Sequence, residues 1–285
     1  MKHIVEDFKI LLAGLDYAGK TSIMLALNEQ KGYIEKVKNL KPTVRVDQVN
    51  INFLGKEVIF WDLGGQERYR NFYNKKREFY FAGTNVLFFI IDIQDEVRFT
   101  SALTYLSTIL SYFEDTDDKM PVVISFHKFD PDLRNNPEFI EHAEKLEEKI
   151  REKHSSFELL FQKTSVYDIV SIVRMISYGL AVLNEDFFEL YELLEEYSGK
   201  LESPGIFLLN GEGMIICNFF KEPIEEKTYE KLTNSLKQHI YELKDLRETN
   251  ESVERKMFDL EDGFRSYLHP INYRKQVYYM SILLK

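Results

Sequence analysis

Glycine, lysine and threonine occur near the N-terminus at the spacing of a phosphate-binding loop. Residues 14–21 follow the pattern Gly-x-x-x-x-Gly-Lys-Thr. They lie between an apolar stretch typical of a strand, residues 8–13, and a stretch typical of a helix, residues 22–27, which is the context that the pattern requires. Glycines let backbone N–H groups approach phosphate oxygens, and a helix N-terminus adds its positive dipole end. The residues expected around the phosphates are Gly14, Leu15, Asp16, Ala18, Gly19, Lys20, Thr21 and Ser22.

Three oxygen-bearing residues are candidates for a Mg²⁺ site beside this loop. The Thr21 hydroxyl is the expected ligand from the loop itself, while Lys20 supplies a point charge to the β and γ phosphates. Asp62 ends a second apolar stretch, residues 58–61, and is placed to hold the metal directly or through water. Thr43, in Lys-Pro-Thr-Val, is placed to close over the metal and the γ-phosphate. An aspartate is also a common helix cap and a threonine after proline a common turn, so the order of the motifs carries this prediction.

The residues after Asp62 indicate a loop that approaches the γ-phosphate. Gly64 and Gly65 follow the aspartate after a single leucine, which favours close approach of the backbone, and Gly65 is the expected contact. Gln66 stands four residues past Asp62, where a glutamine can orient an attacking water. Gln66 is therefore the candidate catalytic residue.

A further group of residues predicts recognition of guanine. An apolar stretch, residues 121–126, runs into His127, Lys128, Phe129 and Asp130. The Asp130 carboxylate can accept two hydrogen bonds from the N1–H and 2-amino groups of guanine, and adenine lacks that donor pair. Lys128 is expected to pack along the base. The short strand-like stretch that begins at residue 159 ends in Thr164 and Ser165, whose backbone N–H groups are candidates to reach the guanine carbonyl.

With these five motifs in order, the chain resembles the Ras superfamily of small GTPases over about residues 5–183. The stretches GLDYAGKTS and WDLGGQE are similar to the Arf and Rag branches, and His-Lys-x-Asp at residues 127–130 resembles the Rag/Gtr branch. The resemblance implies an α/β fold with a mainly parallel sheet flanked by helices, and GTP, GDP and Mg²⁺ as ligands. In the wider superfamily an asparagine stands at the place of His127 and ties the base loop to the phosphate loop. The consequence of histidine for nucleotide affinity is left open.

The remaining residues, 184–285, predict a smaller α+β domain. A helix is expected from about residue 187, two strands flank Asn210 and Gly211, a long helix spans residues 228–246, and two strands lie at residues 263–268 and 276–284. A third late strand is a possibility around residues 257–260. This order resembles the roadblock or longin-like domain of Rag/Gtr proteins, which implies pairing with a second copy or a paralogue. The alternative is a domain that packs only on its own GTPase domain.

Composition and termini limit the partners that we expect. The chain has 285 residues and a net charge of −10, which disfavours binding to nucleic acid or to anionic lipid. One cysteine, Cys217, and no signal peptide fit a reducing cytoplasm. Residue 2 is lysine and the C-terminus has no prenylation cysteine, so no direct lipid anchor is expected. The resemblance to Rag proteins implies recruitment to a membrane surface by a protein scaffold.

Three functions follow from these observations. The favoured one is a switch that hydrolyses GTP slowly and signals to effector, exchange and GTPase-activating proteins through nucleotide-dependent segments. The second is a scaffold that keeps guanine nucleotide bound without hydrolysis. The third, a P-loop ATPase or kinase, is disfavoured by Asp130.

Overall fold

The computed structural model describes residues 8–28, 33–53, 56–181, 187–221, 223–249, 255–273 and 276–285. These residues belong to two compact units. The first comprises residues 1–28, 32–52 and 56–175, and the second comprises residues 29–31, 53–55 and 176–285. Lys2 and the expected domain boundary between residues 183 and 184 lie outside the described residues. The boundary therefore stays a prediction.

The first unit is an α/β fold built on a six-stranded sheet in the order β2-β3-β1-β4-β5-β6. Strand β1 pairs in parallel with β3 and β4, and β5 pairs in parallel with β4 and β6. The strands are β1 (Phe8–Gly14), β2 (Val46–Phe53), β3 (Lys56–Leu63), β4 (Val86–Asp92), β5 (Val122–His127) and β6 (Leu159–Thr164). The mainly parallel sheet expected from the sequence is confirmed.

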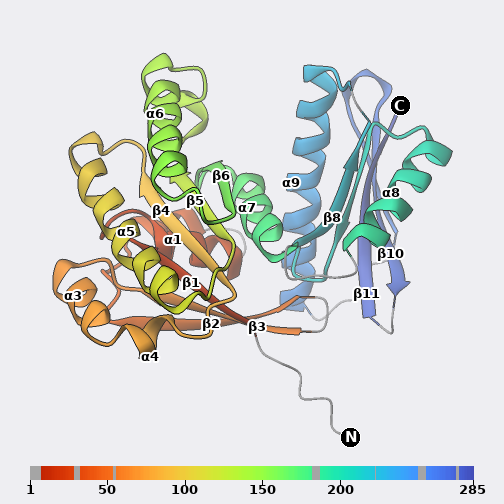
Figure 1. Ribbon diagram of the computed structural model, residues 1–285. Coiled ribbons are helices and arrows are strands. Elements are labelled where there is room, and N and C mark those ends of the chain that lie inside the picture. Colours follow the sequence, from red (N-terminus) through yellow and green to blue (C-terminus); the bar gives the residue numbers. More distant parts are fainter. Residues whose placement is uncertain are drawn as a thin grey trace, which may run out of the picture. The chain divides into compact units, whose positions relative to one another are not determined.

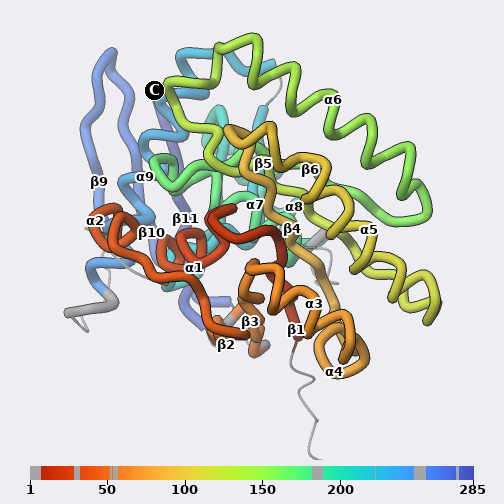
Figure 2. The backbone as a smooth tube through the Cα atoms, turned by 90° about the vertical axis from the view of Figure 1, so that its left-hand side faces the viewer, coloured from red at the N-terminus to blue at the C-terminus, as the bar shows by residue number. Residues whose placement is uncertain are grey.

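Helices cover both faces of this sheet. Figure 1 shows α5 and α6 on one side and α1 and α7 on the other, and Figure 2 shows the same separation from a second direction. The helices are α1 (Lys20–Asn28), α2 (Tyr33–Lys38), α3 (Glu67–Lys75), α4 (Arg77–Phe81), α5 (Phe99–Thr116), α6 (Pro137–Lys153) and α7 (Ile169–Ala181), whose residues from Ile176 on are counted with the second unit. Short 3₁₀ turns lie at Glu96–Arg98 and Pro131–Leu133.

The composition of the central strands explains their position. Strand β4 reads Val-Leu-Phe-Phe-Ile-Ile-Asp and β5 reads Val-Val-Ile-Ser-Phe-His, so both are rich in β-branched and aromatic residues, and nearly all of their side chains are buried. The core on one face combines them with Leu106, Ile109 and Phe113 of α5 and Leu146 of α6. Because parallel strands end at one edge, Asp92 and His127 lie side by side in the sheet register.

The second unit is an antiparallel five-stranded sheet in the order β8-β7-β11-β10-β9. Its elements are α8 (Phe187–Leu201), β7 (Gly205–Leu209), β8 (Ile215–Phe220), α9 (Glu226–Thr249), β9 (Lys256–Asp259), a 3₁₀ turn at Glu261–Gly263, β10 (Arg265–Tyr273) and β11 (Gln276–Leu284). The hairpin around Asn210 is present as β7 and β8, and the third late strand exists as β9. Figure 1 shows α8 and α9 on opposite faces of this sheet. The likeness to a roadblock or longin domain stays a prediction.

Candidate functional site

The loop between β1 and α1 has a backbone that only glycine can adopt at two positions. Gly14 has φ +146°, and a Cβ there would lie 2.3 Å from the carbonyl oxygen of Ile90. Gly19 has φ +97°, and a Cβ there would lie 2.3 Å from Cδ2 of His127. Glycines allow the loop to turn tightly over β4 and β5 and to direct its chain into the start of α1 at Lys20.

Lys20 is a buried cation inside this loop. Its Nζ donates to the carbonyl oxygens of Gly14, at 3.1 Å, and Leu15, at 2.8 Å. Burial lowers the pKa of Lys20 to about 8, while the nearby Asp62 and Asp16 carboxylates act in the opposite direction. A buried ammonium group of this kind gains from an anion placed beside it, because little water competes with the charge.

Side-chain oxygens of three residues meet beside Lys20. The Thr21 Oγ1 atom lies 2.7 Å from Thr43 Oγ1 and donates to Asp62 Oδ2 at 2.7 Å. Thr43 Oγ1 donates to the same Asp62 oxygen at 3.3 Å. Asp62 is buried, burial raises the pKa of its carboxyl, and its Oδ1 atom has no hydrogen-bond partner among the described residues. Hydroxyl and carboxylate oxygens are the donors that Mg²⁺ prefers, so these residues fit that ion.

The loop after β3 lies directly on the phosphate loop. A Cβ on Gly65 would stand 2.2 Å from both the backbone nitrogen of Asp16 and the carbonyl carbon of Leu15. Gly64 donates its N–H to the Arg45 carbonyl at 2.6 Å, which links this loop to the segment that carries Thr43. The Gln66 side chain accepts from Arg68 Nε at 2.9 Å, and Arg70 Nε donates to the Gly65 carbonyl at 2.9 Å.

A cavity of about 390 Å³ opens between these elements. Its lining includes seven of the residues expected at the phosphates or the metal, together with Gln66 and Lys128. Six further residues complete it, of which Tyr17, Lys41 and Pro42 lie inside the sequence motifs and the other three lie outside them. The expected lining residues are Asp16, Gly19, Lys20, Thr21, Ser22, Thr43 and Gly65; the additional ones are Tyr17, Val37, Lys38, Leu40, Lys41 and Pro42. Lys41 adds positive charge at its rim, which favours an anionic ligand, whereas the Lys38 ammonium is paired with the Glu35 carboxylate at 2.8 Å.

The residues predicted to recognise the base lie at the ends of β5 and β6. His127 is buried, and its Nδ1 atom lies 2.8 Å from Thr164 Oγ1, which in turn lies 2.6 Å from Ser125 Oγ. Burial lowers the pKa of His127 to about 3, so the ring is neutral. Its Cδ2–Nε2 edge lies against Gly19, so histidine joins the base loop to the phosphate loop by packing.

Asp130 is held by neighbours on both carboxylate oxygens. Ser165 Oγ donates to Oδ1 at 2.5 Å, and Gln94 Nε2 donates to Oδ2 at 3.2 Å. The backbone N–H of Ser165 donates to Ser171 Oγ at 3.1 Å. The expected contact of the Thr164 and Ser165 N–H groups with a guanine carbonyl stays a prediction.

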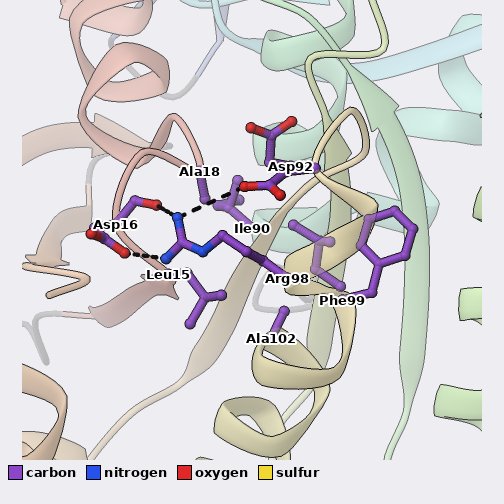
Figure 3. Close-up of a pocket in the computed structure, with 10 residues that line it drawn as sticks. Leu15, Asp16, Ala18, Ile90, Asp92, Arg98, Phe99 and Ala102 are labelled. Carbon is purple, nitrogen blue, oxygen red and sulfur yellow. Dashed lines mark hydrogen bonds and ion pairs between the residues drawn. The ribbon is translucent and has the colours of Figure 1, made fainter. Parts of the chain in front are cut away.

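Two residues outside the sequence motifs also contact this site, Arg98 and Gln94. Arg98 Nη1 donates to the Asp16 carbonyl at 2.9 Å, and the guanidinium forms an ion pair with the Asp16 carboxylate (Figure 3). Gln94, four residues before Arg98, contacts the base motif. Its side chain donates to the Lys128 carbonyl at 2.7 Å and also to the Asp130 carboxylate. Neither residue stands in a recognisable motif, and only the fold brings each to its partner.

Comparison with known proteins identifies the family. Residues 9–236 match the model of the Gtr1/RagA G protein conserved region. The chain therefore belongs to the Gtr1/RagA G-protein family, a family of small GTP-binding proteins in the Ras superfamily, and the resemblance found in the sequence is confirmed.

Two relatives illustrate the likeness. The ADP-ribosylation factor-like protein 3 of Saccharomyces cerevisiae is 28% identical over 127 residues, which are 44% of this chain and 61% of that protein. This chain thus spans less than two thirds of that relative. The Arl6 BBS3 small GTPase from Trypanosoma brucei, solved with bound nucleotide analogue GppNp, aligns with a TM-score of 0.51 and 16% identity. That alignment covers 62% of this chain and 97% of the other, and it supports the fold of the first unit.

Within the part of the chain that the structure describes, no helix combines the length and the apolar character needed to pass through a bilayer.

Proposed function

We propose that this protein binds GTP with Mg²⁺, hydrolyses it slowly to GDP, and acts as a molecular switch. The observation that carries the proposal is the meeting of Thr21, Thr43 and Asp62 oxygens beside the buried Lys20 ammonium. This arrangement supports a bound triphosphate and its metal, and family membership supports the guanine base.

Each group has a distinct role in the proposed complex. Backbone N–H groups of the phosphate loop and Lys20 hold the phosphates. Thr21, Thr43 and Asp62 would hold Mg²⁺, which supplies positive charge to the β and γ phosphates. Asp130 accepts from the N1–H and 2-amino groups of guanine and is held in place by Ser165.

The switch consists of two segments that already contact each other. Gly64 N–H and the Tyr73 hydroxyl both donate to the Arg45 carbonyl, each at 2.6 Å. The γ-phosphate would bring Thr43 and Gly65 to the metal and phosphate together, and hydrolysis would release both segments. A partner protein that recognises their joint surface would thus distinguish GTP from GDP.

Hydrolysis is assigned to Gln66, which orients the attacking water. Its side chain pairs with Arg68 in the present geometry, and Arg70 is engaged with the Gly65 carbonyl. We therefore assign the stabilising arginine of the transition state to a GTPase-activating partner, which contributes about 10³- to 10⁵-fold in rate. Intrinsic turnover is slow.

The second unit is assigned to pairing with a second copy or a paralogue. Its sheet ends in strands β8 and β9, and α8 carries exposed Tyr191 and Tyr197. Edge strands and exposed aromatic groups are features that become buried when two such domains pair. Effectors and exchange factors complete the proposed partners, with recruitment to a membrane surface by a protein scaffold.

Single-turnover hydrolysis of GTP tests the proposal. Wild-type protein with GTP and Mg²⁺ should release phosphate slowly, and Gln66→Leu should bind GTP equally well but hydrolyse it more slowly still, with or without an activating protein. Glu67→Gln, one residue along, is the control and should match wild type. Guanine nucleotide that stays bound and intact even with partners added would instead support the non-hydrolysing scaffold.

A further inference from the structure

The segment from Asp92 to Arg98 touches both loops of the nucleotide site at once. At its start, the Asp92 carboxylate pairs with Lys128 Nζ at 2.5 Å. At its end, Arg98 pairs with Asp16 of the phosphate loop, 82 positions away in the chain. Figure 3 shows the Arg98 guanidinium directed at Asp16, above the apolar groups of Leu15 and Ala102.

The contact of Arg98 is specific in geometry. Two of its nitrogens are used on one residue, with Nη1 on the backbone carbonyl and Nη2 on the carboxylate of Asp16. A planar guanidinium used in this two-point manner fixes orientation as well as distance. Both side chains are about one third exposed or less, so solvent screens the pair only in part.

Gln94 makes the corresponding contacts at the base loop. Its Nε2 atom donates to the Lys128 carbonyl at 2.7 Å and to Asp130 Oδ2 at 3.2 Å. Lys128 has φ +61°, a left-handed conformation that is unfavourable for a side-chain-bearing residue. A hydrogen bond to its carbonyl therefore stabilises the turn that presents Asp130.

The segment between these contacts is itself held rigid. Asp92 Oδ1 accepts from the Gln94 N–H at 3.0 Å, the Asp95 N–H donates to the Asp92 carbonyl at 3.3 Å, and the Arg98 N–H donates to the Asp95 carbonyl at 3.1 Å. Arg98 then leads directly into α5. A rigid segment anchored at both ends can transmit position from one loop to the other.

We propose that residues 92–98 couple the phosphate loop to the base loop, with Arg98 and Gln94 as positioning residues that set how long the protein retains guanine nucleotide. His127 joins the same two loops through its packed ring edge at Gly19, and the 92–98 segment adds directional polar links between them. The inference rests on the proposed function, because it concerns the lifetime of the same nucleotide complex.

The test is the dissociation rate of a fluorescent GDP from the full chain, chased with excess GDP in Mg²⁺ buffer. Loss of either anchor, in Arg98→Ala or Gln94→Ala, should speed release roughly tenfold, the effect of one charge-assisted or well-aligned contact. The release rate of Arg98→Lys should lie between those of the wild type and Arg98→Ala, because lysine keeps the charge but not the two-point contact. Val97→Ala, at a 94% exposed neighbour, and Arg77→Ala, which breaks a surface ion pair elsewhere in this unit, are the controls and should release GDP at the wild-type rate.

Two further readouts separate positioning from general loss of stability. IDP lacks the 2-amino group that is proposed to donate a hydrogen bond to Asp130. Gln94→Ala should therefore reduce the preference for GDP over IDP, whereas Arg98→Ala should leave that preference unchanged. In the double variant, GDP release should be accelerated less than the product of the two single accelerations, because the loss of either Arg98 or Gln94 already uncouples the loops. The unfolding midpoint of each variant identifies those that fold poorly. Arg98→Lys provides a conservative second variant at the same position.

The outcomes are distinguishable. Two results would overturn the coupling while leaving GTP binding intact. One is a GDP release rate of the folded variants within twofold of the controls. The other is a double variant whose release rate equals the product of the two single effects, with an unchanged preference for GDP over IDP. Wild-type protein that binds no guanine nucleotide would overturn the proposed function and the coupling together.

Discussion

The hydroxyl oxygen of Thr43 lies 2.7 Å from that of Thr21, although the two residues are 22 positions apart and belong to different loops. Both hydroxyls also donate to one oxygen of Asp62, whose other oxygen is buried and unpartnered among the described residues. The segment that carries Thr43 is therefore positioned against the phosphate loop by oxygen atoms that a divalent cation would use as ligands. Closure of this segment and metal binding would be a single event.

The first prediction concerns this metal dependence. In the wild type, removal of Mg²⁺ with a chelator should speed GDP release by tenfold or more, because the phosphate charge is no longer neutralised. Asp62→Asn keeps the shape of the side chain but removes the charge that we propose holds the ion. GDP release from this variant should be fast already and should respond little to the chelator. A chelator effect of wild-type size in Asp62→Asn would remove Asp62 from the metal site.

The second prediction concerns close packing of Gly65. A methyl group there would stand 2.2 Å from backbone atoms of Asp16 and Leu15, and backbone cannot move aside cheaply. Gly65→Ala should therefore cost about 1–3 kcal/mol in unfolding free energy and weaken GTP retention. Gly199→Ala is the control, since that glycine lies in α8 with nothing within 4 Å, and should stabilise by about 1 kcal/mol. Chemical unfolding of both variants checks the sign, and a Gly65→Ala protein as stable as wild type would contradict the packing.

The third prediction is a pH dependence that originates in the second unit. His239 is fully buried between Ser281 Oγ, at 2.7 Å, and Ser266 Oγ, at 3.3 Å, and burial lowers the pKa of this histidine from 6.5 to about 4. Between these values the unfolded chain binds a proton that the folded chain does not, so stability falls as pH falls from about 6.5 toward 4.

The variant His239→Gln isolates this contribution. When the pH falls from 7 to 5, the unfolding free energy of the wild type should decrease by about 2 kcal/mol more than that of the variant. Contributions of the other histidines cancel in this difference. Denaturant unfolding at the two pH values measures it. Equal losses in the two proteins would show that His239 is protonated without cost.

The fourth prediction concerns association through α8. Tyr191 and Tyr197 are 38% and 41% exposed, and Tyr191 packs edge-on against Phe219 of strand β8. If this surface pairs two chains, Tyr197→Glu should place a charge in the interface and shift the light-scattering mass toward the monomer. Glu192→Gln on the same helix is the control. An unchanged dimer in Tyr197→Glu would locate the pairing elsewhere.

Much of the fold could be predicted from sequence because its signals are local. Strands such as β4 and β5 are continuous apolar runs, and Gly14–Thr21 has a fixed spacing. No local pattern predicts strand β2 or any of the helices α2 to α6, and β10 extends to Tyr273, beyond the expected end at residue 268. The hairpin pairing of β10 with β11 stabilises those added residues.

The contacts that complete the candidate site are not local. Arg98 and Gln94 are ordinary polar residues in the sequence, and they reach Asp16 and Asp130 only because β4 lies between β1 and β5 in the sheet. His127 departs from the superfamily pattern, which the sequence shows, but its packing against Gly19 depends on a close approach of two loops. Such relations require the register of the strands, which composition and spacing do not specify.

The central claim is that the cavity beside Lys20 takes a guanine nucleotide. The most direct measurement is to denature the purified protein and to identify the released nucleotide by chromatography, for wild type and for Asp130→Asn. We predict GDP or GTP from the wild type and its loss in the variant, because the amide cannot accept both guanine hydrogen bonds. Adenine nucleotide in the wild type, or no nucleotide together with no binding of added GTP and Mg²⁺, would contradict the account.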